Sequence, residues 1–134
     1  MSILVDTSVW SLALRRGEPD PGPEVAYLSD CLVQGRGVLM TGLILQELLQ
    51  GFHGPRQEAR IIAGLSALAC VTPNRDDHIE AARLRNRCRR KGVQVGTIDA
   101  LIAQLCIRYD IELLTTDHDF RRIARAAPLR LAQV

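Results

Sequence analysis

Two short apolar runs in this chain end directly on an aspartate. Residues 3–5 (Ile-Leu-Val) lead into Asp6, and residues 113–116 (Leu-Leu-Thr-Thr) lead into Asp117. Continuous runs of this kind are typical of the buried strands of a parallel sheet, and ligands of open α/β sheets bind beyond the carboxyl ends of those strands. The two runs therefore predict an α/β fold with acidic groups at the functional edge of its sheet.

Strand-like and helix-like segments alternate along all 134 residues. Apolar runs between turn residues predict strands over residues 3–5, 38–40, 70–71, 112–115 and 129–131. Helical spacing predicts helices over residues 7–14, 24–34, 42–51, 56–68, 76–91, 97–109 and 119–126. This order predicts a three-layer α/β/α sandwich with a central parallel sheet of four to five strands, as one domain over residues 1–134. The stretch from Gly17 to Pro23 is expected to form a loop near Asp6.

Composition excludes several classes of protein. No apolar stretch reaches the roughly 18 residues that cross a bilayer, and the amino terminus lacks a signal-type segment. A cytoplasmic protein without a membrane partner is therefore expected. The four cysteines are widely spaced without a CxxC pair, so we expect reduced core residues rather than disulfides or zinc ligands.

The type of basic residue is more informative than the net charge. The net charge is only +2, but all basic residues except Lys91 are arginine, which suits bidentate phosphate contacts. A codon bias toward arginine would give the same count. Aromatic residues make up 4% of the chain, so any nucleic acid would be held mainly by its backbone. The basic run at 83–91 spreads over several helix faces and is interpreted as a solvated helix.

Asp99 is the acid that is hardest to explain by secondary structure alone. The predicted helix 97–109 is apolar on nearly all sides, which is typical of a buried helix. At about 100° per residue, Gln104 and Arg108 share one stripe and Asp99 lies almost opposite, so its carboxylate is expected to face inward. An inward carboxylate needs a cation or a polar cleft, because an isolated buried charge is strongly disfavoured.

Glu47 lies at the margin of the apolar stripe of the helix predicted over 42–51. Two aspartates end strands, while Glu47 and Asp99 belong to helices that leave the same edge of the sheet, so all four acids can converge on one cleft. Carboxylates this close raise one another's pKa and need a counter-charge. An all-oxygen site favours Mg²⁺ or Mn²⁺, ions that activate water and stabilise charge during phosphodiester hydrolysis.

Each acid also has a structural interpretation, and two other functions stay open. The three aspartates could end strands or cap helices, and Glu47 could be a boundary residue in water. The chain would then be a non-catalytic interaction module, although an inward Asp99 argues against it. A Mg²⁺-dependent phosphotransfer or phosphatase domain fits less well, because Lys91 follows a helix instead of a late strand and Ser8 stands where a phosphatase has its second acid.

Four short motifs carry a resemblance that covers the whole chain. They are Val5-Asp6-Thr7-Ser8-Val9-Trp10, Leu45-Gln46-Glu47-Leu48-Leu49-Gln50-Gly51, Asp99-Ala100-Leu101-Ile102-Ala103 and Thr115-Thr116-Asp117-His118-Asp119-Phe120. In this order the motifs resemble the PIN domain family, and specifically the VapC-type ribonuclease toxins of bacterial type II toxin-antitoxin pairs. Any one motif would be weak evidence, whereas the ordered set is specific.

The resemblance implies a PIN-like fold and a Mg²⁺ or Mn²⁺ site. The catalytic and metal-binding residues would be Asp6, Glu47, Asp99 and Asp117, with Asp119 as a further acid and Thr7 and Thr116 as supporting hydroxyls. The resemblance also implies endonucleolytic cleavage of RNA by activated water, leaving a 3′-hydroxyl and a 5′-phosphate. The partners it implies are a second copy of the chain and a cognate antitoxin whose tail fills the acidic cleft.

Contacts to the RNA backbone are expected from cations that flank the acids. The candidates are Arg15 and Arg16 after the first helix, and Arg121 and Arg122 after the last acid.

Overall fold

Four parallel strands lie at the centre of the protein, whose computed structural model describes residues 2–15 and 19–134. The strands are β1 (Ile3–Val5), β2 (Val38–Met40), β3 (Ala69–Cys70) and β4 (Glu112–Leu114). They pair in the order β3-β2-β1-β4, so β1 and β4 are neighbours although most of the chain separates them. The predicted parallel sheet is confirmed, with four strands in the described residues.

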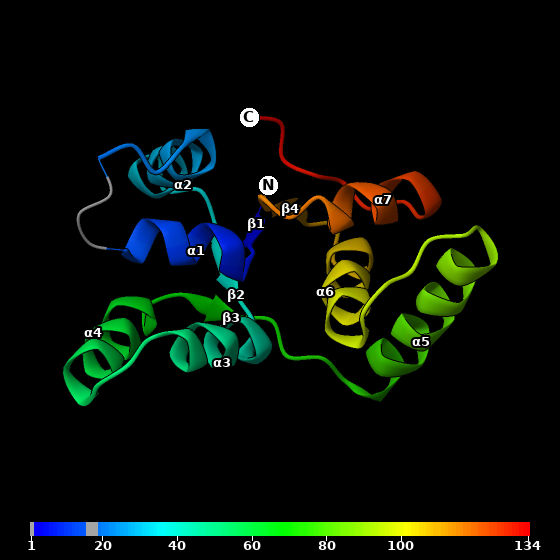
Figure 1. Ribbon diagram of the computed structural model, residues 1–134, viewed down its shortest axis with the longest axis horizontal. Helices are drawn as coiled ribbons and strands as arrows, with labels where there is room; N and C mark the ends of the chain where they lie inside the picture. Colours follow the sequence, from blue (N-terminus) through cyan, green and yellow to red (C-terminus); the bar gives the residue numbers. More distant parts are fainter. Residues whose placement is uncertain (1, 16–18) are drawn as a thin grey trace.

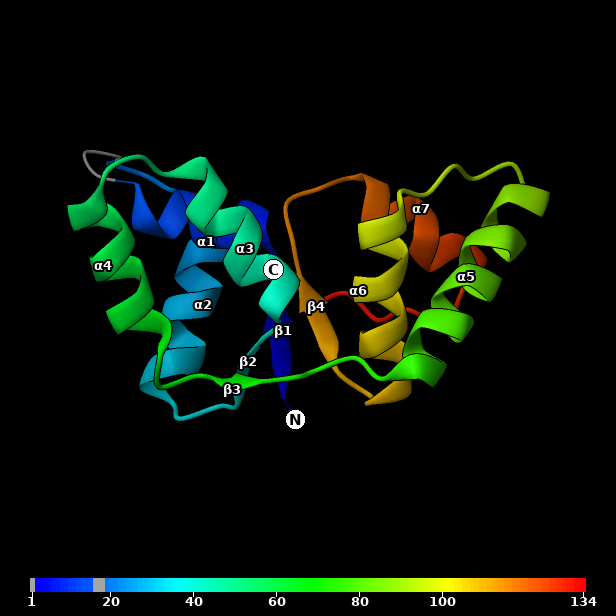
Figure 2. The ribbon, with the colours of Figure 1, turned by 90° about the horizontal axis from the view of Figure 1, so that it is seen from below.

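Helices cover both faces of this sheet. The helices are α1 (Thr7–Leu14), α2 (Pro23–Val33), α3 (Gly42–Gly51), α4 (Pro55–Leu65), α5 (Arg75–Arg90), α6 (Thr97–Arg108) and α7 (Asp119–Ala126). The first four lie on one side of the strands and the last three on the other (Figure 1). The same division is visible after a quarter turn (Figure 2). The α/β/α sandwich expected from the sequence is therefore confirmed. Within the described residues, no helix has the length and apolar character needed to cross a membrane.

Burial explains why the strands read as continuous apolar runs. All three side chains of β1 are completely buried, as are Leu113 and Leu114 of β4 to within 1%. The helix α6 is buried from Ala100 to Cys106, and its apolar side chains pack against the strands. The strands β1 and β4, which lead to Asp6 and Asp117, and the helix α6, which carries Asp99, are thus deeply buried. Close packing of these elements holds their ends rigidly.

Two details differ from the sequence-based expectations. The strand expected at 129–131 is wrong, because only Leu131 forms an isolated bridge, with Leu113. Pro128 lacks a backbone donor, and the adjoining residues make no further ladder with β4. The expectation that all four cysteines belong to the core is wrong for Cys70, which is exposed on the edge strand β3, although all four are free thiols.

Helix α5 is more than the solvated helix expected from its charges, because it carries a completely buried acid. Asp77 is 0% exposed and forms a reciprocal capping box with Asn74, in which both side chains accept backbone N–H bonds at 2.9 Å. Its Oδ1 also pairs with the guanidinium of Arg108 in α6. Burial alone would raise the pKa of Asp77, but the hydrogen bond from Arg108 and the backbone N–H of Asn74 lower it below 3.8.

Asp77→Asn should therefore destabilise the fold in a pH-dependent way. A carboxyl whose pKa is lowered by folding stabilises the folded state above its unfolded pKa, and this contribution is lost as the pH falls through the folded pKa. We expect the variant to be less stable than the wild type at about pH 7 and the difference to shrink below about pH 4. Denaturant unfolding across this range measures it, with Asp76→Asn, an exposed acid one residue away, as the control. A difference that stayed constant down to low pH would show that the charge of Asp77 is not responsible.

Candidate metal centre

Asp6 is fixed at the point where β1 ends. Its backbone N–H donates to Leu114 O at 2.9 Å, so the pairing of β1 with β4 extends one residue past the strands. The residue is 6% exposed, and its Oδ2 accepts hydrogen bonds from Ser8 Oγ and Thr115 Oγ1, both at 2.8 Å. Two hydroxyl groups from different strand ends therefore orient this carboxylate.

The same hydroxyl groups hold the segment between β4 and α7. Thr115 Oγ1 accepts the backbone N–H of Asp117 at 3.0 Å, and Ser8 Oγ accepts that of Thr116 at 3.1 Å. Asp117 Oδ1 in turn accepts the backbone N–H of Asp119 at 2.9 Å, where α7 begins. This chain of bonds sets the positions of both acids relative to Asp6.

Three carboxylates form the tightest part of the cluster. One carboxylate oxygen from each of Asp99, Asp117 and Asp119 lies within 4.8 Å of the other two. Asp99 belongs to the first turn of α6 and is half-buried, while Asp119 is exposed. An all-oxygen donor set of this size suits a hard divalent cation such as Mg²⁺ or Mn²⁺ and not zinc.

The pKa of Asp99 is raised by its burial and by the other acids of the cluster. Burial is the largest cause that raises its pKa, to about 6, and repulsion from Asp117, Asp6, Asp119 and Glu47 adds to it in that order. Beneath the cluster, burial together with the charge of Asp6 raises the pKa of Cys106 to about 12. The other three acids predicted from the sequence, and Asp119, therefore all lie close enough to Asp99 to raise its pKa.

Glu47 joins the group from α3, on the other side of the sheet from Asp99. Its Oε1 accepts a hydrogen bond from Thr7 Oγ1 at 3.0 Å. The helix that carries it begins at an N-cap, where Thr41 Oγ1 accepts the backbone N–H of Ile44 at 3.2 Å. Glu47 and Asp6 lie outside the tight trio but close enough to raise the pKa of Asp99.

Sequence reasoning missed two residues of this network, Ser8 and Thr115. Both hydroxyl groups adjoin the strand-end acids, which is the signal that could have found them. Thr7 and Thr116 were expected as supports instead. Thr7 does contact Glu47, whereas Thr116 enters the network through its backbone N–H. The spacing alone does not reveal which of two adjacent hydroxyl residues points to the acid.

The arginines predicted to contact RNA are placed unevenly. Arg15 is exposed at the end of α1, and Arg16 lies outside the described residues. Arg121 is exposed on α7, while Arg122 pairs with Asp119 at 3.6 Å. Of the described candidates, Arg122 therefore contacts an acid of the cluster directly.

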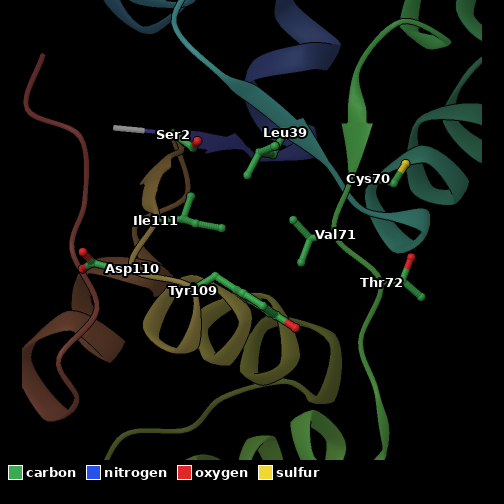
Figure 3. A pocket seen from close by; sticks show the side chains of 8 residues that line it. All are labelled: Ser2, Leu39, Cys70, Val71, Thr72, Tyr109, Asp110 and Ile111. Atoms are coloured by element: carbon green, nitrogen blue, oxygen red, sulfur yellow. The ribbon is translucent and has the colours of Figure 1, made fainter.

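A separate pocket of about 600 Å³ has none of the clustered acids in its lining (Figure 3). Ser2 precedes β1 and Ile111 precedes β4, whereas Cys70 ends β3, so the pocket reaches from the amino ends of β1 and β4 to the carboxyl end of β3. Its one acidic residue, Asp110, pairs with Arg130 at 2.7 Å. The pocket therefore contributes nothing to the acidic cluster.

Comparison with known proteins agrees with this geometry. A family model described as PIN domain matches residues 3–126. The chain belongs to the PIN domain family. Ribonuclease VapC11 of Mycobacterium tuberculosis is 33% identical to this PIN domain protein over 137 residues, which cover 97% of each of the two chains.

Solved structures show the same fold at lower identity. VapBC2 of Rickettsia felis, bound to a DNA fragment from its promoter, matches with a TM-score of 0.78 and 20% identity over 98% of both chains. VapBC-5 of Mycobacterium tuberculosis, a member of the VapBC family of toxin-antitoxin systems, matches with a TM-score of 0.68 and 22% identity. That match covers 99% of this chain and 98% of the VapBC-5 chain. These likenesses concern the fold alone.

Asp99→Asn should stabilise the protein when no divalent cation is present. A carboxyl whose pKa is raised by folding destabilises the folded state once the pH exceeds its unfolded pKa, and the penalty is complete above the folded pKa of about 6. Removing this charge should raise the free energy of unfolding at about pH 7 by roughly 1 to 2 kcal/mol, after allowance for solvent screening. At about pH 4 the gain should vanish.

Denaturant unfolding in EDTA measures this effect. Asp30→Asn, on the exposed side of α2, is the matched control and should change little at either pH. An equal gain at both pH values would mean that packing, and not repulsion among the acids, sets the effect.

Proposed function

We propose that this chain is a Mg²⁺- or Mn²⁺-dependent endoribonuclease that acts as the toxin of a toxin-antitoxin pair. The observation that carries the proposal is the convergence of Asp99, Asp117 and Asp119 within 4.8 Å, with Asp6 and Glu47 nearby. VapC11, which matches this chain over nearly its whole length, is named a ribonuclease, and this supports the same class of reaction. An interaction module would have no use for several carboxylates that repel one another at this edge.

The chain's own residues would divide the work of hydrolysis. The aspartates would hold the ion, with Asp6 oriented by Ser8 and Thr115. Glu47 would hold the ion or position the attacking water. When bound, a divalent cation supplies a lowered pKa for that water and neutralises charge on the phosphoryl oxygens. Attack of water on phosphorus breaks the P–O3′ bond, and the products carry a 5′-phosphate and a protonated 3′-hydroxyl.

The proposed partners are an antitoxin protein and a second copy of the chain. Structural neighbours from VapBC systems, one of them a toxin-antitoxin system by its description, support an antitoxin partner. An antitoxin that inhibits this reaction would act by covering the acidic cluster, because every ligand of the proposed ion lies there. The homodimer is proposed on the family resemblance.

Metal-dependent cleavage is the direct test. Purified protein is incubated with single-stranded and with structured RNA, in Mg²⁺, Mn²⁺ or EDTA. We expect cleavage in either ion, none in EDTA, and a loss of about 100-fold or more in Asp6→Asn and Asp99→Asn. Asp30→Asn should cleave like the wild type. Equal cleavage by all variants would place the reaction elsewhere, and folded protein that cleaves no RNA would favour the interaction module.

Ser8→Ala tests whether the hydroxyl support of Asp6 matters. Ser8 donates to Asp6 and accepts from Thr116, so its loss should loosen both strand ends. We expect the concentration of Mg²⁺ needed for half-maximal cleavage to rise about 10-fold or more, and saturating Mg²⁺ to restore part of the rate. Ser11→Ala, one turn further along α1, should keep the wild-type requirement. An unchanged requirement in Ser8→Ala would show that Asp6 is positioned without this hydroxyl.

A further inference from the structure

A hollow of about 460 Å³ lies between the last turns of α5 and the segment that leads into α6. Its lining residues are Arg85, Arg89, Gln94, Val95 and Gly96. Arg85 and Arg89 are four residues apart and therefore lie on the same side of α5. Two guanidinium groups and a side-chain amide give the hollow donors suited to an anion, and none of these lining residues is acidic.

Both guanidinium groups are held by neutral partners. Arg85 Nε donates to Val95 O at 2.8 Å, and Arg89 Nη2 donates to Asn86 Oδ1 at 2.8 Å. Neither pairs with an acid among the residues that the structure describes. Other arginines there do so: Arg36, Arg83, Arg108, Arg122 and Arg130. The positive charge at this hollow is therefore oriented but not neutralised.

The hollow is lined by the segment that leads into α6, the helix whose first turn carries Asp99. Gly96 directly precedes α6 and Asp99 lies in the first turn, so about 4.5 Å of helix axis separates them. Figure 2 shows the segment between α5 and α6, the start of α6 and the segment from β4 to α7 along one edge. The first backbone N–H groups of α6 add positive potential there.

We propose that this hollow binds a backbone phosphate of RNA beside the one held at the acidic cluster, an inference that rests on the proposed nuclease function. The cluster repels the RNA backbone, so binding needs fixed cations at a neighbouring phosphate. Arg85 and Arg89 supply them on the side of α6, and the Gln94 amide adds a neutral donor. The Val95 contact orients the planar group of Arg85, which suits recognition of a phosphate.

Arg89→Gln tests the site in the full chain. The probe is a fluorescent single-stranded RNA of about 12 nucleotides, bound in EDTA so that it is not cleaved. We expect its Kd, and the KM of cleavage in Mg²⁺, to rise about five- to tenfold with little change in kcat. The slope of log Kd against log salt should fall by about 0.7. Arg85→Lys keeps the charge, so its Kd should rise while its salt slope is unchanged.

Arg87→Gln is the matched control, because Arg87 is exposed on α5 two residues away and does not line the hollow. Equal losses in Arg87→Gln and Arg89→Gln would overturn the site in favour of general positive charge. If the wild type cleaves RNA and Arg89→Gln keeps its Kd and KM, the hollow is overturned and the nuclease stands. If no RNA is cleaved but Arg89→Gln still weakens probe binding, the nuclease fails and the phosphate site stands. Weaker binding of an acidic peptide alone, with RNA binding unchanged, would assign the hollow to a protein partner and overturn the proposal.

Discussion

The backbone hydrogen bond from Asp6 N to Leu114 O holds the carboxyl ends of β1 and β4 together where both strands leave the apolar core. Ser8 and Thr115 continue this junction with side-chain bonds, so the two strand ends behave as one unit. The helices that carry Asp99 and Glu47 pack on opposite faces of the same strands. Without this junction, acids that are far apart in the chain would not be held in fixed positions relative to one another.

The joined ends of β1 and β4 bring together carboxylates whose negative charges repel one another. Asp99 shows the consequence most clearly, because burial and four neighbouring acids raise its pKa to about 6. A buried β1 and α6 provide the packing energy that tolerates such repulsion. Clustered carboxylates lower the free energy of unfolding of the free protein, and binding of a cation raises it again. The same repulsion that opposes folding therefore favours a hard cation.

The sheet and its helices follow from patterns within single segments, which is why the sequence could predict them. The convergence of the acids follows from their order along the chain, because parallel strands place their carboxyl ends at one edge of the sheet. The apolar runs before Asp6 and Asp117 can be recognised as strands from their own residues, because a strand that is buried on both faces is apolar throughout. The roles of Ser8 and Thr115 depend on rotamers and on the register between β1 and β4, which no local pattern contains. Asp77 was hidden for a similar reason, since its partner Arg108 lies in another helix. Near Leu131 the backbone N–H of Leu129 bonds locally to Ala127 O and only a single bridge to Leu113 forms, which the apolar run in the sequence does not reveal.

Arginine content illustrates how structure divides one residue type between two roles. Arg108 has its charge matched by the buried carboxylate of Asp77, so it holds α5 against α6 and offers little to a ligand. Within residues 2–15 and 19–134, Arg85 and Arg89 have only neutral partners, so no acid matches their charge. A net charge of +2 averages over both kinds and conceals the difference. The ligands that a surface attracts depend on where its unmatched charge lies. Here negative charge gathers on the carboxylates near the strand ends, and positive charge held by neutral partners lies on α5.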